Sequence, residues 1–460
     1  MNLAGRPVTV IGAAKSGLAA ARGLLGLGAR VFISDLQPLE RLQKTLCEAG
    51  LGPETGVTCE GGGHTERALD ADFLVLSPGV PTTIPILRKA QERGIPIHSE
   101  IEIAYRLSQG RRLVVTGSNG KTTTTTLLAK FCERAFPRVF LGGNIGIPMM
   151  EFAAQTRPDD VQVLEVSSFQ LETVSSFTPD IAVITNFYEN HLDRYPDYEA
   201  YCQAKERIAM NMGPSHWLVL NADQPRMTAL AGQVRCRVAW FGWQLGERRP
   251  GVTCEDGRFF WVNEAGAREP LFPDASIKLI GRHNRENVMA ATAAARLAGV
   301  PVAALEPVLR EFGGVEHRLE WVRELDGITF INDSKGTNCA ASIIAMNACR
   351  PPMILIAGGR DKGTDLSAWV TAVRTRTKGV VLYGEARERF RSALEGLAPL
   401  MLASSFAEAV ELAHQWAVAG DTVLLSPACS SYDLFPNFEV RGTVFKELVA
   451  KLTPKGASRS

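Results

Sequence analysis

The sequence predicts an α/β protein of three domains, each built on a largely parallel sheet. Apolar runs of three to six residues recur along the chain, and each is followed by a glycine-rich or polar loop and then by a helical pattern. This alternation is typical of doubly wound sheets. The length of 460 residues favours about three domains. We expect the boundaries at 1–99, 100–314 and 315–460, with a Rossmann-like first and third domain.

Composition excludes several classes of protein. A net charge of +1 gives no global attraction to nucleic acid or to anionic membranes, and no apolar run reaches the 18 residues expected of a membrane span. The nine cysteines form no C-x-x-C pair, so neither a disulfide scaffold nor a zinc site is expected. Lys15 and Arg22 interrupt the apolar N-terminal segment, which argues against a signal peptide. We therefore expect a cytoplasmic location.

The first block starts with a strand at 8–11, a glycine turn at 12–17 (GAAKSG) and a helix at 18–27. The turn is similar to the dinucleotide pattern G-x-G-x-x-G, but Ala14 replaces the middle glycine, where the backbone approaches a pyrophosphate. Asp35 follows the next strand, where an acidic residue often binds a ribose. Residues 12–17 and Asp35 therefore allow three interpretations. They could form the dinucleotide site of a dehydrogenase, or a site for a nucleotide-linked diphosphate in which Asp35 forms a hydrogen bond with the base or the sugar. The segment could also be a structural turn.

The second block carries a phosphate loop. A buried strand at 113–115 leads into the segment TGSNGKTTT at 116–124, and a helical pattern follows to 130. In such a loop, Lys121 reaches the β- and γ-phosphates and the Thr122 hydroxyl binds Mg²⁺. The usual pattern has a glycine where this chain has Val115. The strand and helix on either side nevertheless predict a site for a nucleoside triphosphate.

Three further residues of this block are candidates for chemistry. Glu165 lies within the apolar strand 161–166, and a buried carboxylate needs a metal ion or a partner. His191 lies among carboxylates after the strand 181–185, although a single histidine is more often structural. Lys205 lies in a helical pattern, and spacing alone favours a solvated surface lysine.

In the third block, polar loops follow three expected strands at 329–331, 353–357 and 422–425. The loops are NDSKGTN at 332–338, GGRDKG at 358–363 and SPACSS at 426–431. Because parallel strands end at the same edge of a sheet, these loops predict a pocket for an anionic small molecule. Cys429 has no histidine partner in the sequence, so we interpret it as a packing residue.

These motifs together resemble the Mur ligases over nearly the whole chain. The segments at 426–431 and 438–442 resemble the corresponding segments of the branch of the family that adds D-glutamate. The Rossmann-like first block excludes the branches whose N-terminal domain is different. The resemblance rests on residues 116–124, 142–146, 165–171, 191–196, 283–284, 317–318, 332–338 and 426–442.

The resemblance implies an ATP-dependent ligase of peptidoglycan precursor synthesis. A carboxylate of UDP-N-acetylmuramoyl-L-alanine would attack the γ-phosphate of ATP to give an acyl phosphate and ADP, and the amine of D-glutamate would then displace phosphate. It also implies two Mg²⁺ ions, a carbamylated lysine and a monomer, with no nucleic-acid partner.

The resemblance also implies residue roles. Lys121, His191 and Lys205 would be catalytic. ATP would bind at Gly117, Ser118, Asn119, Gly120, Lys121, Thr122, Thr123, Asn284, Arg318 and Asp333. Metal ions would bind at Thr122, Glu165, His191 and Lys205 as its carbamate. The UDP group would bind at Lys15, Ser16 and Asp35, the muramoyl part at Asn144 and His191, and D-glutamate at Lys335, Thr337, Lys362, Ser431 and Phe438.

Two positions differ from the family pattern, and other classes compete. Leu36 follows Asp35 where a polar partner for uracil is expected, and the segment around Lys362 differs slightly from the usual one. A folylpolyglutamate synthase should lack the first Rossmann-like block. An NAD-dependent oxidoreductase would leave Lys121 and Thr122 without a role, and a nucleotide-binding regulator would not need Glu165, His191 and Lys205.

Overall fold

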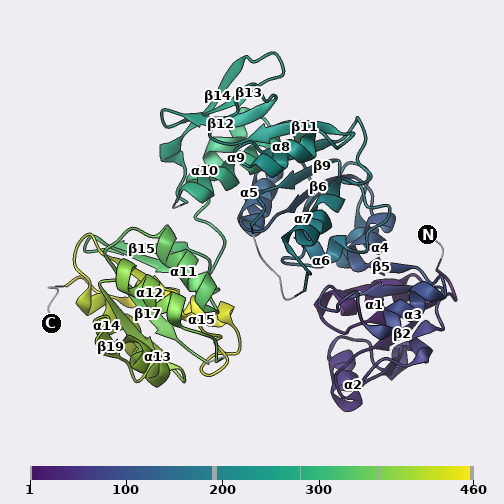
Figure 1. The fold of residues 1–460 in the computed structure, drawn as a ribbon, viewed down its shortest axis with the longest axis horizontal. Coiled ribbons are helices and arrows are strands. Elements are labelled where there is room, and N and C mark those ends of the chain that lie inside the picture. The colour runs from purple at the N-terminus through teal and green to yellow at the C-terminus, as the bar shows by residue number, and fades with distance from the viewer. Residues whose placement is uncertain (1–2, 189–193, 280, 361–362, 456–460) are drawn as a thin grey trace. The chain divides into compact units, whose positions relative to one another are not determined.

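A computed structural model describes residues 3–188, 194–279, 281–360 and 363–455 (Figure 1). The chain forms two compact units. The first contains residues 1–276 and 286–308, and the second contains residues 277–285 and 309–460. The mixed α/β class expected from the sequence is confirmed, while the three domain boundaries stay a prediction.

The first sheet has the strand order β3-β2-β1-β4-β5, and all of its strands are parallel. The direction of winding reverses between β1 and β4, so the loop after β1 opens at the switch point of the sheet. The strands are β1 (Pro7–Ile11), β2 (Arg30–Ser34), β3 (Thr58–Glu60), β4 (Phe73–Leu76) and β5 (Ile97–Ser99). The helices are α1 (Lys15–Gly26), α2 (Leu39–Glu48) and α3 (Pro85–Glu92).

The second sheet has nine strands in the order β14-β13-β12-β11-β10-β9-β6-β8-β7. The strands from β7 to β12 are parallel, and the antiparallel strands β13 and β14 continue the sheet beyond β12. The strands are β6 (Arg111–Thr116), β7 (Val139–Gly143), β8 (Val161–Glu165), β9 (Ile181–Ile184), β10 (Trp217–Asn221), β11 (Arg237–Phe241), β12 (Gly251–Glu255), β13 (Arg258–Val262) and β14 (Arg268–Pro273). The helices are α4 (Glu100–Leu107), α5 (Lys121–Glu133), α6 (Ser168–Leu171), α7 (Tyr198–Glu206), α8 (Pro225–Ala231), α9 (Arg282–Ala298) and α10 (Leu305–Glu311).

A continuous cluster of buried apolar side chains joins the first two sheets within the first unit. It runs from α1 to α4 and to Met149 and Met150, which follow β7. Gly23 of α1 lies so close to Met150 that a Cβ there would come within 2.6 Å of the Met150 side chain. The Met150 amide also donates a 2.6 Å hydrogen bond to the buried carboxyl of Glu100. This packing fixes the first sheet to the second.

The third sheet has the order β15-β16-β20-β17-β18-β19, and only the edge strand β15 is antiparallel among its described pairings. The last strand in sequence, β20, thus lies in the centre. Helices α11 to α13 pack on one face of the sheet, and α14 and α15 pack on the other. The strands are β15 (Glu320–Leu325), β16 (Ile328–Asn332), β17 (Met353–Gly358), β18 (Gly379–Tyr383), β19 (Leu400–Leu402) and β20 (Thr422–Leu425). The helices are α11 (Cys339–Ala348), α12 (Ser367–Arg376), α13 (Arg387–Leu394), α14 (Phe406–Trp416) and α15 (Phe438–Lys451).

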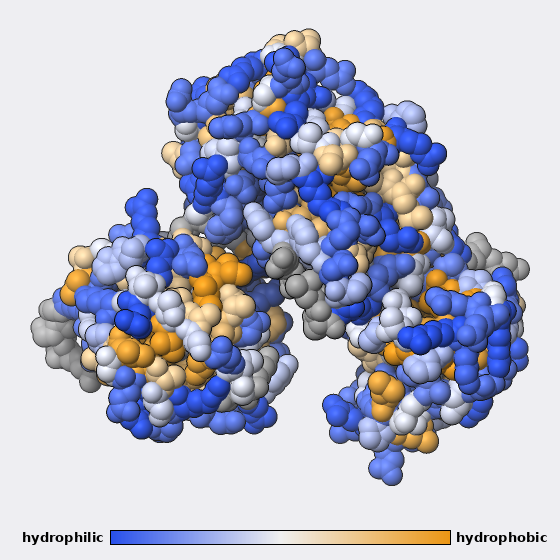
Figure 2. Space-filling view, viewed as in Figure 1, coloured by the Kyte–Doolittle hydropathy of each residue, from blue (hydrophilic) through white to orange (hydrophobic). Residues whose placement is uncertain are grey.

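The visible surface is largely hydrophilic and carries small groups of apolar residues (Figure 2). Exposed apolar side chains include Leu36, Ile344 and Val418. In the part of the chain that the structure describes, no helix is both long and apolar enough to span a bilayer.

The glycine turn after β1 generates the first prediction. A Cβ on Gly17 would lie 1.9 Å from the Gly12 carbonyl oxygen, so even alanine has no space there. We expect Gly17→Ala to lower the free energy of unfolding of the first unit by about 1–3 kcal/mol, measured by denaturant titration. Gly26→Ala is the matched control because Gly26 lies in the same helix and a Cβ there would meet nothing within 4 Å. Equal stability of the two variants would contradict the steric argument.

Candidate active site

The loop between β6 and α5 has the geometry of a phosphate cradle. Gly117 and Gly120 have positive φ angles of 140° and 79°. A Cβ on Gly117 would lie 1.9 Å from Thr185 Oγ1, and one on Gly120 would lie 2.1 Å from Asn287 Oδ1, so both positions require glycine. No side chain caps the N-terminus of α5. Its first amide groups are therefore free of a side-chain cap and can bind an anion.

The carboxyl end of β9 holds this loop in place. The Asn119 amide donates to Asn186 Oδ1 over 2.8 Å, and the Thr185 hydroxyl donates to the Asn119 carbonyl over 2.7 Å. The Ser118 amide donates to the Asn186 carbonyl over 2.9 Å. Sequence reasoning did not assign Thr185 or Asn186 to the site. Their position directly after a buried strand beside the loop strand is the signal that was available.

Lys121 folds back over the loop. Its Nζ donates to the Gly117 carbonyl over 3.0 Å and to the Ser118 carbonyl over 2.9 Å. Thr123 is buried in the first turn of α5. The ammonium of Lys121 therefore lies at the mouth of the cradle, where it can balance phosphate charge.

Glu165 connects the ends of three neighbouring strands. Its Oε2 accepts a 2.8 Å hydrogen bond from the Thr122 hydroxyl, and its Oε1 accepts one of 2.8 Å from Asn144 Nδ2. A Cβ on Gly143 would lie 2.3 Å from the Glu165 carbonyl oxygen, so a glycine is needed for this close approach of β7 to β8. The Thr122 hydroxyl and the Glu165 carboxylate are the hard oxygen donors that Mg²⁺ prefers. The described residues contain no group of three or more His, Cys, Asp or Glu side chains that could bind a metal ion by themselves.

Lys205 is buried, contrary to the expectation from spacing alone. It is 1% exposed and its Nζ lies 4.7 Å from the centre of the Tyr201 ring. Among the described residues it has no hydrogen-bond acceptor and no ion-pair partner. Burial, and then the charge of Lys121, lower its pKa well below the ordinary value, although Cys202 and Glu165 act in the opposite direction. This shift favours the neutral amine over the ammonium.

At the carboxyl edge of the first sheet, Asp35 ties together two loops. Its Oδ2 accepts a 2.6 Å hydrogen bond from the Ala13 amide, and its Oδ1 accepts one of 2.8 Å from the Gln37 amide. Lys15 begins α1 and donates to the Gly146 carbonyl, in the loop that carries Asn144, while Ser16 lies in the first turn of α1. Leu36 is 70% exposed and contributes no polar group here.

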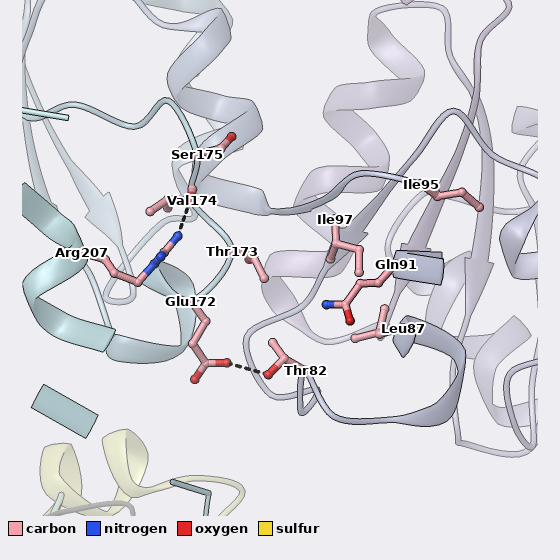
Figure 3. A pocket seen from close by; sticks show the side chains of 10 residues that line it. All are labelled: Thr82, Leu87, Gln91, Ile95, Ile97, Glu172, Thr173, Val174, Ser175 and Arg207. Atoms are coloured by element: carbon pink, nitrogen blue, oxygen red, sulfur yellow. Dashed lines mark hydrogen bonds between the residues drawn. The ribbon is translucent and has the colours of Figure 1, made fainter. Parts of the chain in front are cut away.

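Arg194 joins the same edge to the second sheet. Its Nη1 donates to the Pro78 carbonyl over 2.7 Å and its Nη2 donates to Glu172 Oε2 over 2.9 Å. Glu172 also accepts from Thr82 over 3.3 Å, and the two face each other beside a pocket of about 280 Å³ (Figure 3). The neighbouring residue His191 lies outside the described residues. Sequence reasoning missed Arg194 and Glu172 because their partners are distant in the chain.

In the second unit, Asp333 follows β16 and is buried. Its Oδ2 accepts a 2.7 Å hydrogen bond from the Ser426 hydroxyl, and its Oδ1 accepts one of 3.3 Å from the Leu319 amide. Burial raises its pKa to about 7, although the Ser426 hydrogen bond and the positive charge of Arg318 oppose the shift. Asn284 is buried near the start of α9, in the segment that belongs to the same unit.

A buried arginine brings the loops after β16 and β20 together. Arg441 of α15 is fully buried and donates from Nε to Ser334 Oγ over 2.9 Å and from Nη1 to the Cys429 carbonyl over 3.2 Å. The Ser334 hydroxyl donates to the Phe438 carbonyl over 2.8 Å. These contacts fix the backbone around four of the residues expected to bind D-glutamate. Ser431 is buried, Thr337 and Phe438 are half-buried, and Lys335 Nζ lies 5.9 Å from the Phe438 ring. The fifth expected residue, Lys362, lies outside the described residues.

Family comparisons agree with this organisation. Residues 6–99 match the Mur ligase MurD-like N-terminal domain, residues 115–295 the Mur ligase middle domain, and residues 317–429 the Mur ligase glutamate ligase domain. The chain is 44% identical to UDP-N-acetylmuramoylalanine--D-glutamate ligase of Acidobacterium capsulatum, with 100% of this chain and 98% of that protein covered. It is 42% identical to the ligase of the same name from Pelotomaculum thermopropionicum, with 97% and 98% covered.

Solved structures show the same fold at low sequence identity. The UDP-N-acetylmuramate-alanine ligase MurC of Thermotoga maritima matches with a TM-score of 0.56 at 18% identity, covering 97% of this chain and 99% of that one. The MurF ligase of Thermotoga maritima in complex with ADP matches with a TM-score of 0.53 at 16% identity, covering 83% and 90%.

Three α/β domains in this order, with a phosphate loop in the middle one, define a class of ligases. The chain belongs to the Mur ligase family. The turn at residues 12–17 lies within the part of the chain that matches the MurD-like N-terminal domain.

The raised pKa of Asp333 predicts a pH dependence of stability. The folded unit holds this proton up to about pH 7, whereas an unfolded aspartate releases it near pH 4. The contribution of this group to the free energy of unfolding is therefore fully present below about pH 4 and is lost as the pH rises through about 7. The total decrease in the free energy of unfolding is up to about 4 kcal/mol. We expect Asp333→Asn to flatten this decline, measured by denaturant titration without nucleotide.

Glu100→Gln is the control in the other unit, since burial raises the pKa of Glu100 to about 7 as well. It should flatten only the transition of the first unit. If Asp333→Asn leaves the pH dependence of the second unit unchanged, the buried carboxyl is not the group that titrates.

Proposed function

We propose that this chain joins D-glutamate to UDP-N-acetylmuramoyl-L-alanine, with cleavage of ATP to ADP and phosphate, in peptidoglycan precursor synthesis. The observation that carries the proposal is the match at 42–44% identity to relatives that bear this activity as their name, over nearly the full length of both chains. The phosphate cradle and the polar loop cluster after β16 and β20 supply the chemistry that such a reaction needs.

The reaction has two steps. A carboxylate resists attack by an amine until it carries a good leaving group, so the substrate carboxylate first takes the γ-phosphoryl group of ATP and becomes an acyl phosphate. The amine of D-glutamate then attacks the acyl carbon, phosphate leaves, and the amine loses its proton. Lys121 and the amide groups at the start of α5 balance the charge of the transferred phosphoryl group.

We propose two Mg²⁺ sites. Thr122 and Glu165 would hold the first ion with their hydroxyl and carboxylate oxygens. His191 and Lys205 would hold the second, with Lys205 as a carbamate. A neutral amine adds to carbon dioxide and releases one proton, so the lowered pKa of Lys205 favours this modification. The product carries a carboxylate in place of the amine, and a carboxylate suits a hard metal ion. When bound, the ions would stabilise the negative charge on the phosphoryl group.

We assign the substrates to three segments. Residues 1–99 would bind the UDP group through Lys15, Ser16 and Asp35, and residues 100–314 would bind ATP and, through Asn144 and His191, the muramoyl part. Residues 315–460 would bind D-glutamate. The proposed contacts in this last segment are Lys335, Thr337, Lys362, Ser431 and Phe438 for D-glutamate, and Arg318 and Asp333, with Asn284, for the adenine nucleotide. We also propose that the protein acts as a monomer in the cytoplasm.

An assay of ADP release tests the function directly. We expect release with ATP, Mg²⁺, UDP-N-acetylmuramoyl-L-alanine and D-glutamate, and little with L-glutamate, L-lysine or meso-diaminopimelate in its place. Release that required a folate substrate would favour a folylpolyglutamate synthase, and no release with the UDP substrate would overturn the proposal.

The position of Lys121 predicts a large loss of activity on its removal. We expect Lys121→Ala to lower kcat at least about a hundredfold, because the variant loses the ammonium that lies over the loop carbonyls and balances phosphate charge. Lys130→Ala is the matched control, since Lys130 lies in the same helix but is exposed and pairs with Glu133 at the surface. A folded Lys121→Ala protein with the activity of the control would contradict the role of the loop.

Carbamylation of Lys205 predicts chemical rescue. We expect Lys205→Ala to be nearly inactive and to regain part of its activity with added acetate or formate, whose carboxylate replaces the carbamate. Lys121→Ala should gain nothing from the same salts. NMR of protein equilibrated with isotope-labelled bicarbonate should show a carbamate signal that Lys205→Ala lacks. An unlabelled Lys205 in an active enzyme would refute the modification.

A further inference from the structure

His64 belongs to a polar cluster at the carboxyl edge of the first sheet. None of the sequence motifs predicts a role for this histidine. It follows three glycines in the loop after β3. The Gly62 amide donates to the Gln37 carbonyl over 2.7 Å and the Gly63 amide donates to the Asp35 carbonyl over 3.3 Å. The loop after β3 therefore lies beside the loop after β2, at the edge of the parallel sheet where the glycine turn after β1 also lies. Ligands of such sheets bind at this edge.

The hydrogen bonds of the cluster determine which ring nitrogen of His64 carries the proton. Ser34 Oγ lies 2.7 Å from Glu60 Oε1 and 2.7 Å from His64 Nδ1. Burial raises the pKa of Glu60, but hydrogen bonds from Ser34 and Thr65 outweigh it and the net shift is downward, so this carboxylate only accepts. The single Ser34 proton is then donated to Glu60, and Ser34 Oγ accepts from His64 Nδ1–H.

His64 consequently presents a hydrogen-bond acceptor. Burial lowers the pKa of its imidazole, against the opposing effect of the Glu60 and Asp35 charges, so the ring is neutral at neutral pH. With the proton on Nδ1, the Nε2 atom carries a lone pair. Nε2 has no hydrogen-bond partner among the described residues, and the side chain is only half-buried. A fixed tautomer with an open acceptor is an arrangement suited to recognising a donor.

We propose that His64 Nε2 accepts a hydrogen bond from the uridine of the UDP substrate and thereby helps to select uridine, an inference that rests on the proposed function. Uridine offers two kinds of donor, the N3–H of the base and the ribose hydroxyls. Cytosine has a lone pair at N3, so it cannot replace the base donor. Asp35, which is also proposed to bind the UDP group, accepts one backbone amide on each oxygen, and Leu36 has no polar group. His64 therefore adds a second side-chain acceptor at this edge of the sheet.

Calorimetric titration of the full-length protein with UDP, CDP and three analogues, 3-methyl-UDP, 2′-deoxy-UDP and 3′-deoxy-UDP, tests the proposal. We expect one of the three analogues to bind the wild type roughly five- to tenfold more weakly than UDP, the loss expected for one hydrogen bond. Weaker binding of 3-methyl-UDP identifies N3–H as the donor, and CDP should then bind weakly too. Weaker binding of a deoxy analogue identifies the ribose hydroxyl that it lacks. Equal binding of UDP and all three analogues would overturn the proposal.

His64→Phe keeps an aromatic ring but has no hydrogen-bond acceptor. We expect this variant to bind UDP about as weakly as the wild type binds the analogue that lacks the donor. The variant should then show no preference for UDP over that analogue. A structural role alone would weaken all ligands equally and keep the preference, which would overturn the inference. His64→Gln, whose amide oxygen can accept, should restore part of the preference and provides a second variant if the first does not fold. ADP release by the wild type with the UDP substrate is measured in parallel, so a failure of the proposed function is recognised separately.

Discussion

The hydrogen bonds that converge on Glu165 are the interaction on which the central site depends. The strand order places β8 between β6 and β7, so the loops after all three strands end at one point of the sheet. The carboxylate accepts one hydrogen bond from each side, from the Thr122 hydroxyl and from the Asn144 amide group. A buried carboxylate without such donors would be strongly destabilising. The same two bonds therefore satisfy Glu165 and hold the phosphate loop in register with the loop proposed to contact the muramoyl group.

Glu100 and Lys205 in the first unit and Asp333 in the second are buried without full compensation. Among the described residues, Lys205 has no acceptor beside its tyrosine ring, and the carboxylate of Asp333 accepts only from a hydroxyl and a backbone amide. Structural ion pairs explain neither of these last two environments. Burial shifts the pKa of Lys205 and of Asp333 in the direction that favours the neutral form, and strongly perturbed groups of this kind concentrate at functional sites. The family resemblance had already singled out both residues.

The central strands were predictable from the sequence because burial on both faces gives them continuous apolar runs. The predicted strand at 422–425 has the bounds of β20, and the predicted strands at 161–166 and 181–185 extend one residue beyond β8 and β9. The short edge strands β3, β5 and β19 were not predictable, since three residues carry no periodicity. Strand β15 was missed because its mixed pattern, including the half-exposed Trp321, is that of an edge.

The site residues that are close together in the sequence were predictable. The site residues that are far apart in the sequence and come into contact only in the folded protein were not. The cradle of Lys121 and Thr122 is local, and its position is as expected. Arg194 donates to the Pro78 carbonyl and Arg441 to the Ser334 carbonyl, and contacts between residues so far apart in the sequence leave no motif. Spacing misplaced Lys205 at the surface because a single lysine in a helical pattern does not show what packs over it. The tautomer of His64 likewise follows only from its contact with Ser34.

The position of β20 has a consequence for the synthesis of the chain on the ribosome. This strand is the last one translated, yet it lies between β16 and β17 in the centre of the third sheet. Arg441, which closes the surrounding loops, comes later still, in the final helix. The nascent second unit thus exposes two unpaired strand edges until translation is nearly complete, whereas the first two sheets are entirely translated by residue 273. The interval before termination is therefore the period in which the growing polypeptide is most exposed to aggregation and most dependent on chaperones.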